Sequence, residues 1–437
     1  MNSMLHIQKE AQVDDSIQSY KRFSYLPISG TNLNNANPIV IRVENSDNYF
    51  RPSDSEIEIE GTVTKENGTH YKKDDSKLAL ANNGLMFLFD NIKYELSNIE
   101  IDSVYNPGQA TTMFGLLTKN RDYNSGGGLN SGWLMDDGDG KADKDTNTGY
   151  ENRRKQLFVN NSVAGDDANS GSFRFSIRLE DIFGFAADYT RVLYGFTHTL
   201  TLVRNLNTAD ALFVAADGPT DPKITFTNIS WILPTVDPSE VANYELTKLI
   251  NEQKTLAIDF RVRQCLTTTV PQTNEFRWRI GIRQAPEKPR YIVVGFQTDK
   301  EGDLKKNIGL FDHCQVKNTF ALLNNQRYPA IDYHTDFTKH QYNCLYREFY
   351  LFLGKYFGIN HSVTSTAVDP VSYKHLFPLI VYDVSRQSER VQQAVVDITI
   401  AFQFGVNVAE KTKAYCLMIS DRRLKFKSDG TKANLVF

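Results

Sequence analysis

The sequence predicts an all-β protein made of two tandem β-sandwiches joined by a helix. Three observations support this fold class. The 437 residues exceed what one ordinary core organises, so two domains are expected. Aromatic residues make up 12% of the chain, with 27 Phe and 21 Tyr, and such rings suit pleated, half-buried surfaces. Short runs with β-type alternation fill one half, stop at a helical segment and then start again.

The first sandwich is expected over residues 38–236. The run PIVIRVEN at 38–45 places Ile39, Ile41 and Val43 at alternate positions, so this strand has one apolar face. Clusters of Asn, Asp, Gly and Pro separate it from further runs. These runs are predicted at 55–64, 85–89, 92–101, 172–179, 192–204 and 224–233.

A long polar segment interrupts this half at residues 119–171. It is rich in Gly, Asn, Asp and Ser, and it includes a GGG run that begins at Gly126. A structureless segment of this length counts against a compact domain unless it has its own role at a surface. We therefore expect an exposed loop that presents Gly126, Trp133 and Asp139.

A connecting helix is predicted over residues 237–254. Asp237 can cap it, Pro238 suits the first helical position, and Glu240 completes a spacing like that of a capping box. At the other end of the first sandwich, residues 1–37 show little periodicity. We expect them to form an N-terminal arm.

The second sandwich is expected over residues 255–437. An aromatic helix over 342–357 stops at Gly358, and a shorter helical element at 181–185 is its expected counterpart in the first half. The order of strands and helix occurs twice without sequence repetition, so we predict two similar domains. The strands of the second half are predicted at 256–262, 276–282, 291–297, 316–323, 376–384, 394–404 and 414–419.

Two groups of residues could bind a metal or act in catalysis. The long polar segment contains an acidic stretch at 136–145. Its residues Asp137, Asp139 and Asp143 are weak candidates for a calcium site, but their spacing fits a calcium loop poorly and we favour a solvated loop. His313 beside Cys314 could form a nucleophilic pair, but nothing near them supplies an oxyanion hole, so we favour packed side chains.

Other sequence features point away from enzymes and nucleic-acid binding. Motifs for phosphate binding, zinc proteases and nucleophile elbows do not occur, so we expect no catalytic residues and no cofactor. The formal net charge is -3 and the basic residues do not cluster, which argues against direct binding of nucleic acid. No signal peptide or spanning segment is evident, so synthesis in the cytoplasm or nucleus is expected.

Three segments resemble one known family. They are ISWILPTVDPSEVANYEL at 229–246, PRYIVVGFQTDKEGDLKKNIGLFDHCQVKNTFALLNNQRYP at 289–329, and LEDIFGFAADYTRVLYGFTHTLTLVR at 179–204. The first looks like the join in double jelly-roll major capsid proteins. The other two are similar to hexon-like capsid proteins of Polinton-like and adintovirus-type double-stranded DNA viruses.

The resemblance implies that each sandwich is an eight-stranded jelly roll and that the chain forms a homotrimer. Such trimers are pseudo-hexagonal capsomers that tile an icosahedral shell, which places the protein in the virion. The partners implied are neighbouring capsomers and penton and minor capsid proteins, with an inner membrane as a further candidate.

Two other functions remain open from the residues themselves. A tandem β-sandwich that binds carbohydrate is the strongest alternative, with Trp133 as its best feature because exposed aromatic side chains stack on sugars. An enzyme of the glycoside-hydrolase type is the third hypothesis, since its paired carboxylates converge in space rather than in sequence.

Overall fold

The computed structural model describes residues 15–44, 48–72, 77–160, 170–252, 255–280, 288–360, 364–387, 396–428 and 433–436. Parts of several predictions lie outside these residues. They are 1–14 of the arm, 161–169 of the long loop, 253–254 of the connecting helix, and residues 45, 281–282 and 394–395 of the strands predicted at 38–45, 276–282 and 394–404.

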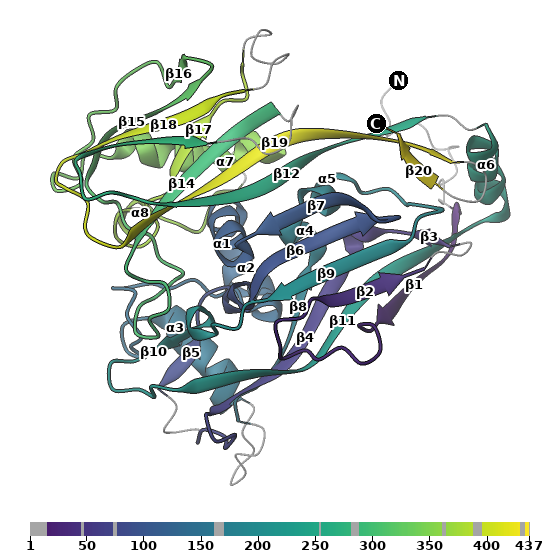
Figure 1. Cartoon of the computed structure of the whole chain (residues 1–437), viewed down its shortest axis with the longest axis horizontal. Helices are drawn as coiled ribbons and strands as arrows, with labels where there is room; N and C mark the ends of the chain where they lie inside the picture. Colours follow the sequence, from purple (N-terminus) through teal and green to yellow (C-terminus); the bar gives the residue numbers. More distant parts are fainter. Residues whose placement is uncertain are drawn as a thin grey trace, which may run out of the picture.

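The strands of the first half form two main sheets (Figure 1). One sheet has the order β1-β11-β4-β8 with β3 beside β11, the other has the order β2-β9-β6-β7, and β5 pairs with β10 in a small third sheet. The strands are β1 (Ile17–Tyr25), β2 (Ile39–Val43), β3 (Tyr49–Phe50), β4 (Glu56–Lys65), β5 (Leu78–Leu80), β6 (Phe89–Leu96), β7 (Ile99–Tyr105), β8 (Ser172–Arg178), β9 (His198–Arg204), β10 (Leu212–Val214) and β11 (Pro222–Pro238).

The second half also has two main sheets. Their orders are β12-β19-β14-β17, with β20 beside β19, and β13-β18-β15-β16. The strands are β12 (Leu256–Thr269), β13 (Glu275–Ile280), β14 (Lys288–Thr298), β15 (Val316–Leu323), β16 (Gln326–Tyr328), β17 (Ile380–Asp383), β18 (Ile398–Phe404), β19 (Thr412–Ser428) and β20 (Ala433–Val436).

The two halves share one strand topology. If the main strands of each half are numbered in chain order, one sheet reads 1-8-3-6 and the other 2-7-4-5, in both halves. These are eight-stranded jelly rolls, as predicted. In the first half, β1 is strand 1 and β2 is strand 2; in the second, β12 and β13 take these places.

The first jelly roll begins earlier than predicted. Strand β1 pairs with β11 from Ile17 opposite Pro238 to Tyr25 opposite Trp231, so residues 17–25 belong to the sandwich and the predicted arm is wrong there. Most side chains of β1 are exposed, so no apolar alternation marks this strand in the sequence.

Other strand predictions in the first half need correction, and the one at 192–204 is confirmed only from His198, where β9 begins. The predicted strand 85–89 is wrong, because η3 (Gly84–Leu88) is a buried 3-10 helix there. The predicted run 92–101 is not one strand but a hairpin of β6 and β7. It turns at Ser97 and Asn98, whose φ angles of 49° and 66° are left-handed.

The helices lie mainly between the strands of the first half. They are α1 (Pro107–Thr118), α2 (Arg121–Ser125), α3 (Thr148–Arg154), α4 (Leu179–Ile182), α5 (Gly184–Asp188), α6 (Glu240–Asn251), α7 (Asn343–Phe357) and α8 (Pro370–His375). The short turns are η2 (Pro52–Asp54), η4 (Gly127–Ser131), the π-helix η5 (Lys155–Val159) and η6 (Ala209–Ala211).

The connecting helix α6 lies within the predicted range, but its cap differs. The Ser239 side chain accepts a hydrogen bond from the backbone N–H of Ala242, and the helix begins at Glu240. Asp237 instead lies near the end of β11 and pairs with Lys21 of β1 at 3.1 Å. The predicted capping role of Asp237 is therefore wrong.

The aromatic helix of the second half is confirmed as α7, which ends at Gly358 with a φ of 67°. Its counterpart in the first half is α1 rather than the predicted segment 181–185. Both α1 and α7 lie between strands 5 and 6 of their jelly rolls, whereas α4 and α5 lie between strands 6 and 7. Figure 1 shows α1 between the two halves, with α7 beside the strands of the second half.

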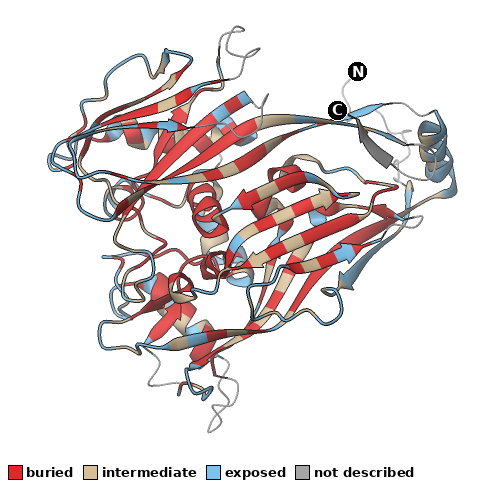
Figure 2. Ribbon diagram, viewed as in Figure 1, coloured by how far each residue is buried: buried red, intermediate tan, exposed pale blue. Residues whose placement is uncertain are grey.

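One continuous apolar core runs through both halves and the helices between them (Figure 2). Strand β4 shows how the sheets contribute, because Ile57, Ile59 and Val63 are buried while most of the alternate side chains are half-buried. Among the described residues, no helix is long and apolar enough to cross a membrane.

Candidate functional site

The joint between the two jelly rolls is built on aromatic side chains of α1 and α7. The Phe114 ring lies 6.5 Å from Phe352 and 5.3 Å from Tyr356, in both cases edge to face. Arg263 of β12 places its guanidinium 3.7 Å from the centre of the Phe114 ring. Such contacts add to the free energy of burying the rings, so the two halves are held as one body.

Two arginines of β12 complete the joint. Arg261 binds both carboxylate oxygens of Asp188, with Nε 2.8 Å from Oδ2 and Nη2 2.5 Å from Oδ1, and donates to the Tyr356 carbonyl at 2.7 Å. Arg263 donates to the carbonyls of Glu180 and Asp181 at 2.9 and 3.1 Å. These bonds fix the position of β12 relative to α4 and α5, which lie far from it in the sequence.

The close approach of the halves also needs a glycine. A Cβ added to Gly184 of α5 would lie 1.5 Å from the Arg261 carbonyl oxygen, so no other residue fits without a backbone shift. This contact lies beside the Arg261–Asp188 pair. The first turn of α5 is therefore part of the joint rather than a surface element.

The segment 119–171 is not the exposed loop that the sequence predicted. Trp133 is 2% exposed and packs against α1, where a Cβ on Gly115 would meet its ring at 2.3 Å. Gly126 and Asp139 are exposed, but α2, α3, η4 and η5 give the described part of the segment regular structure. Because the segment is rich in polar residues, the sequence did not reveal that Trp133 is buried and anchors it.

A buried polar cluster holds this segment in place. Arg153 of α3 donates from Nε to the Leu80 carbonyl at 2.8 Å and from Nη2 to Asp136 Oδ1 at 2.6 Å, and it also binds the Leu134 carbonyl. Asn147 caps α3 and donates to Asp136 at 2.8 Å. The side chains of Arg153 and Asp136 are only 2% and 1% exposed, so each depends on the other for compensation of its charge.

The three weak metal candidates do not form a site. Asp137 accepts a hydrogen bond from the backbone N–H of Thr148 at 2.5 Å, and Asp143 accepts one from the backbone N–H of Asp145 at 2.9 Å. Asp139 pairs with Lys141 at 2.8 Å, which lowers the pKa of its carboxyl group. Within the described residues, no three His, Cys, Asp or Glu side chains gather as metal ligands.

His313 and Cys314 are also placed in packing roles. The His313 ring stacks on Phe337 at 4.4 Å, and its Nδ1 accepts a hydrogen bond from the backbone N–H of Gln315 at 3.0 Å. Burial raises the pKa of the Cys314 thiol to about 12, so this group is protonated at neutral pH. The pair lacks the thiolate that nucleophilic catalysis needs.

Exposed apolar side chains gather at one end of the molecule. Helix α6 has no buried residue, and Val241, Tyr244 and Leu249 are 76%, 69% and 49% exposed. Strand β1, which begins opposite the end of β11 that leads into α6, exposes Ile17 and Phe23. Figure 1 shows β1, β20 and α6 at this same end of the molecule. Exposed apolar groups of this kind mark surfaces for protein contacts.

Comparison with known proteins identifies the architecture. A family model described as a double jelly roll-like domain matches residues 151–424. No curated protein sequence matches the chain.

Solved viral structures share the fold over nearly the whole chain. A chain of the Sputnik virophage is similar with a TM-score of 0.60 and 11% identity, covering 100% of this chain and 92% of that one. The mavirus major capsid protein has a TM-score of 0.55 and 12% identity, covering 100% and 93%. The Faustovirus major capsid protein has a TM-score of 0.54 and 8% identity, covering 95% and 92%. With one topology in both halves and a family model over most of its length, the chain belongs to the double jelly roll-like domain family.

Proposed function

We propose that the chain is a structural major capsid protein that trimerises into pseudo-hexagonal capsomers of an icosahedral viral shell. The observation that carries this proposal is the repeated topology. Three copies of a chain with two equivalent sandwiches bring six similar units around one axis, which is the arrangement a pseudo-hexagonal unit needs. The similarity to viral capsid chains supports the same role.

The joint supports this role because a shell subunit must keep its two jelly rolls in fixed orientation. Aromatic packing between α1 and α7 and the Arg261–Asp188 pair provide that rigidity. The proposed location is the virion, after synthesis in the host cytoplasm or nucleus. The proposed partners are neighbouring capsomers and penton and minor capsid proteins, with an inner membrane as a further candidate, and the role is structural rather than enzymatic.

The carbohydrate-binding alternative loses its best feature. Trp133 was its candidate for stacking on sugars, but the ring is 2% exposed and packed against α1. The hydrolase hypothesis has no specific observation in its favour. We therefore propose no second function.

Light scattering of the purified chain tests the trimer. The expected mass is three times the 49.7 kDa of the single chain, and electron micrographs of the expressed material should show pseudo-hexagonal particles. A stable folded monomer at all protein concentrations, with no assembly in the micrographs, would contradict the proposal.

A further inference from the structure

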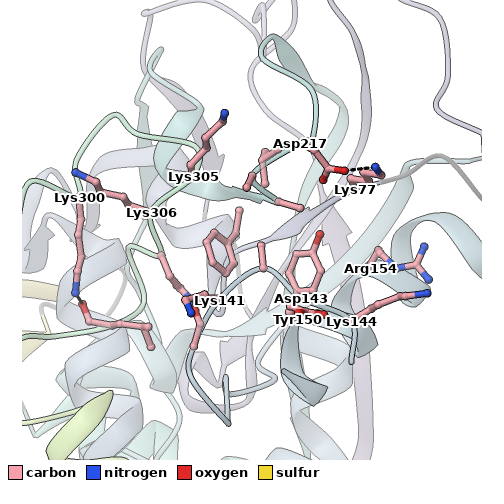
Figure 3. Close-up of a pocket in the computed structure, with 18 of the residues that line it drawn as sticks. Lys77, Lys141, Asp143, Lys144, Tyr150, Arg154, Asp217, Lys300, Lys305 and Lys306 are labelled. Atoms are coloured by element: carbon pink, nitrogen blue, oxygen red, sulfur yellow. Dashed lines mark hydrogen bonds and ion pairs between the residues drawn. The ribbon is translucent and has the colours of Figure 1, made fainter. Parts of the chain in front are cut away.

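A hollow of about 910 Å³ opens where the first jelly roll meets a loop of the second (Figure 3). One wall comes from the segments around α3 and β10, and the other from residues 300–310. Its size lies within the range of small-molecule sites, and boundaries between domains are common places for such sites. We call this feature the basic hollow.

Backbone contacts fix the two walls relative to each other. The backbone N–H of Val214 donates to the Leu304 carbonyl at 2.8 Å, and that of Gly302 donates to Asp210 Oδ1 at 2.6 Å. Gly140 approaches the second half so closely that an added Cβ would lie 2.6 Å from Leu310 Cδ1. The hollow is therefore preformed.

Positive side chains dominate its lining. Five come from the first half, namely Lys77, Lys141, Lys144, Arg154 and Lys155. Three come from the second half, namely Lys300, Lys305 and Lys306. Only Asp143 and Asp217 among the lining residues are acidic. Figure 3 shows the labelled cations around the opening rather than along one side.

Several of these cations have carboxylate partners, most of which stand outside the lining. Arg154 and Lys155 pair with Glu151, Lys300 pairs with Asp312 at 2.9 Å, and Lys306 pairs with Asp299. The lining itself carries eight cations and two carboxylates. The local field therefore favours negative charge there.

Two lysines are available for a ligand. Lys144 and Lys305 are exposed and form no ion pair within 4.0 Å with any described residue. They come from opposite walls, and Figure 3 shows them on opposite sides of the opening. A ligand with several separated negative groups would engage both.

The floor of the hollow argues against nucleic acid. Tyr150 and Phe213 lie there edge to face at 5.7 Å, but each is only 2% exposed, so neither offers a ring for a base to stack on. Single-stranded nucleic acids are bound through such stacking along a charged groove. Half-buried Val159 and Leu310 give a small aliphatic surface instead.

We propose that the basic hollow binds a compact polyanion, a saturated ring that carries several phosphate or sulfate groups. The charged groups meet the lysines of both walls, and the ring rests on Val159 and Leu310. This site goes beyond the proposed capsid role and does not depend on it. A ligand that contacts both walls also holds the two jelly rolls together.

Titration calorimetry of the full chain at low ionic strength tests the site. The probes are inositol hexakisphosphate for the phosphate source, a heparin-derived tetrasaccharide for the sulfate source, and uncharged myo-inositol as the control ligand. We expect either charged probe to bind, or both to bind in competition with each other. We expect myo-inositol not to bind. Added salt should weaken the binding.

A double variant, Lys144→Ala with Lys305→Ala, locates the binding. Its affinity should fall about tenfold, because two charge contacts are lost. The matched control is Lys248→Ala with Lys317→Ala, which removes two exposed lysines elsewhere and changes the net charge equally. The control should bind like the original chain.

Three outcomes would overturn the proposal. They are no binding of either charged probe, equal loss of affinity in both double variants, and displacement of the probes by a short single-stranded oligonucleotide that binds more tightly. Light scattering of the same samples keeps the capsid proposal separate. A trimer without polyanion binding rejects only the hollow, whereas a monomer that binds the probes rejects only the trimer.

Discussion

Arg261 and Arg423 stand on neighbouring strands, and each binds one aspartate through two nitrogens, yet their surroundings differ. The side chains of Arg261 and Asp188 are 22% and 14% exposed, whereas those of Arg423 and Asp259 are 65% and 61% exposed. Water and salt screen the outer pair, so only the inner pair is expected to stabilise the fold.

Replacing Arg261 with Ala should lower the free energy of unfolding by about 2 kcal/mol, because Asp188 is left half-buried without its partner. Chemical denaturation measures this change. Arg423→Ala is the matched control and should leave the midpoint unchanged. If the two variants lose equal stability, the joint does not depend on the inner pair.

Burial of His198 predicts a dependence of stability on pH. Its Nδ1 lies 2.8 Å from the Tyr94 hydroxyl, and burial lowers the pKa of the imidazole from 6.5 to about 3. The unfolded chain therefore takes up a proton between these values while the folded chain does not. The contribution of His198 to stability is fully present above pH 6.5 and is lost as the pH drops towards 3, by up to about 1.4 kcal/mol per pH unit.

Thermal unfolding across this pH range checks the effect. His198→Gln keeps a polar group near Tyr94 but cannot titrate, so its stability should fall less steeply with acid than that of the original chain. His334→Gln, at an exposed position, is the control and should retain the original slope. Equal slopes in all three proteins would show that His198 makes no contribution.

At the scale of elements, the described part of segment 119–171 packs against α1 rather than forming a surface loop. Its buried contents, Trp133 and the Asp136–Arg153 pair, link α3 to α1 and to β5. Surface loops tolerate changes in length, but buried anchors do not. Removal of residues 126–145 is therefore expected to prevent folding instead of leaving it intact.

Trp133→Ala isolates the anchor and should cost about 3–5 kcal/mol, the range for loss of a large buried ring. Leu129→Ala is a control in the same segment, since Leu129 is 42% exposed, and it should cost little. Denaturant midpoints of both variants give the comparison. A stable deletion variant together with a mild Trp133 effect would restore the surface-loop interpretation.

At the scale of the whole molecule, the exposed face of α6 is expected to serve assembly rather than folding. Changing Val241, Tyr244 and Leu249 together to Ser should leave the thermal midpoint nearly unchanged, because these side chains are exposed. Particles in electron micrographs should be lost or reduced, since neighbouring subunits lose an apolar contact.

Exposed polar side chains of the same helix supply the control. Glu245→Ser with Lys248→Ser also changes exposed side chains of α6, and it should leave particle formation intact. Unfolding of the apolar variant would show that α6 stabilises the single chain. Undiminished particles from that variant would show that this face is not an assembly contact.

Much of the fold could be predicted because alternation along a strand is a local signal. Ile39, Ile41 and Val43 are buried on one face as their spacing predicted, and Gly358 ends α7 in the left-handed conformation that glycine favours. Strand β1 was missed because its partner β11 lies at the far end of the first jelly roll's sequence, and its own side chains stay exposed.

Local patterns in the chain were enough to establish the all-β class, the two tandem domains and the helix that connects them, because periodicity and helix signals act between near neighbours. Other features came only from folding. The folded chain placed Trp133 in the core, matched α1 with α7, joined Arg261 to Asp188 and gathered lysines from both halves around one hollow. Each of these depends on contacts between residues far apart in the chain, which a local pattern cannot specify.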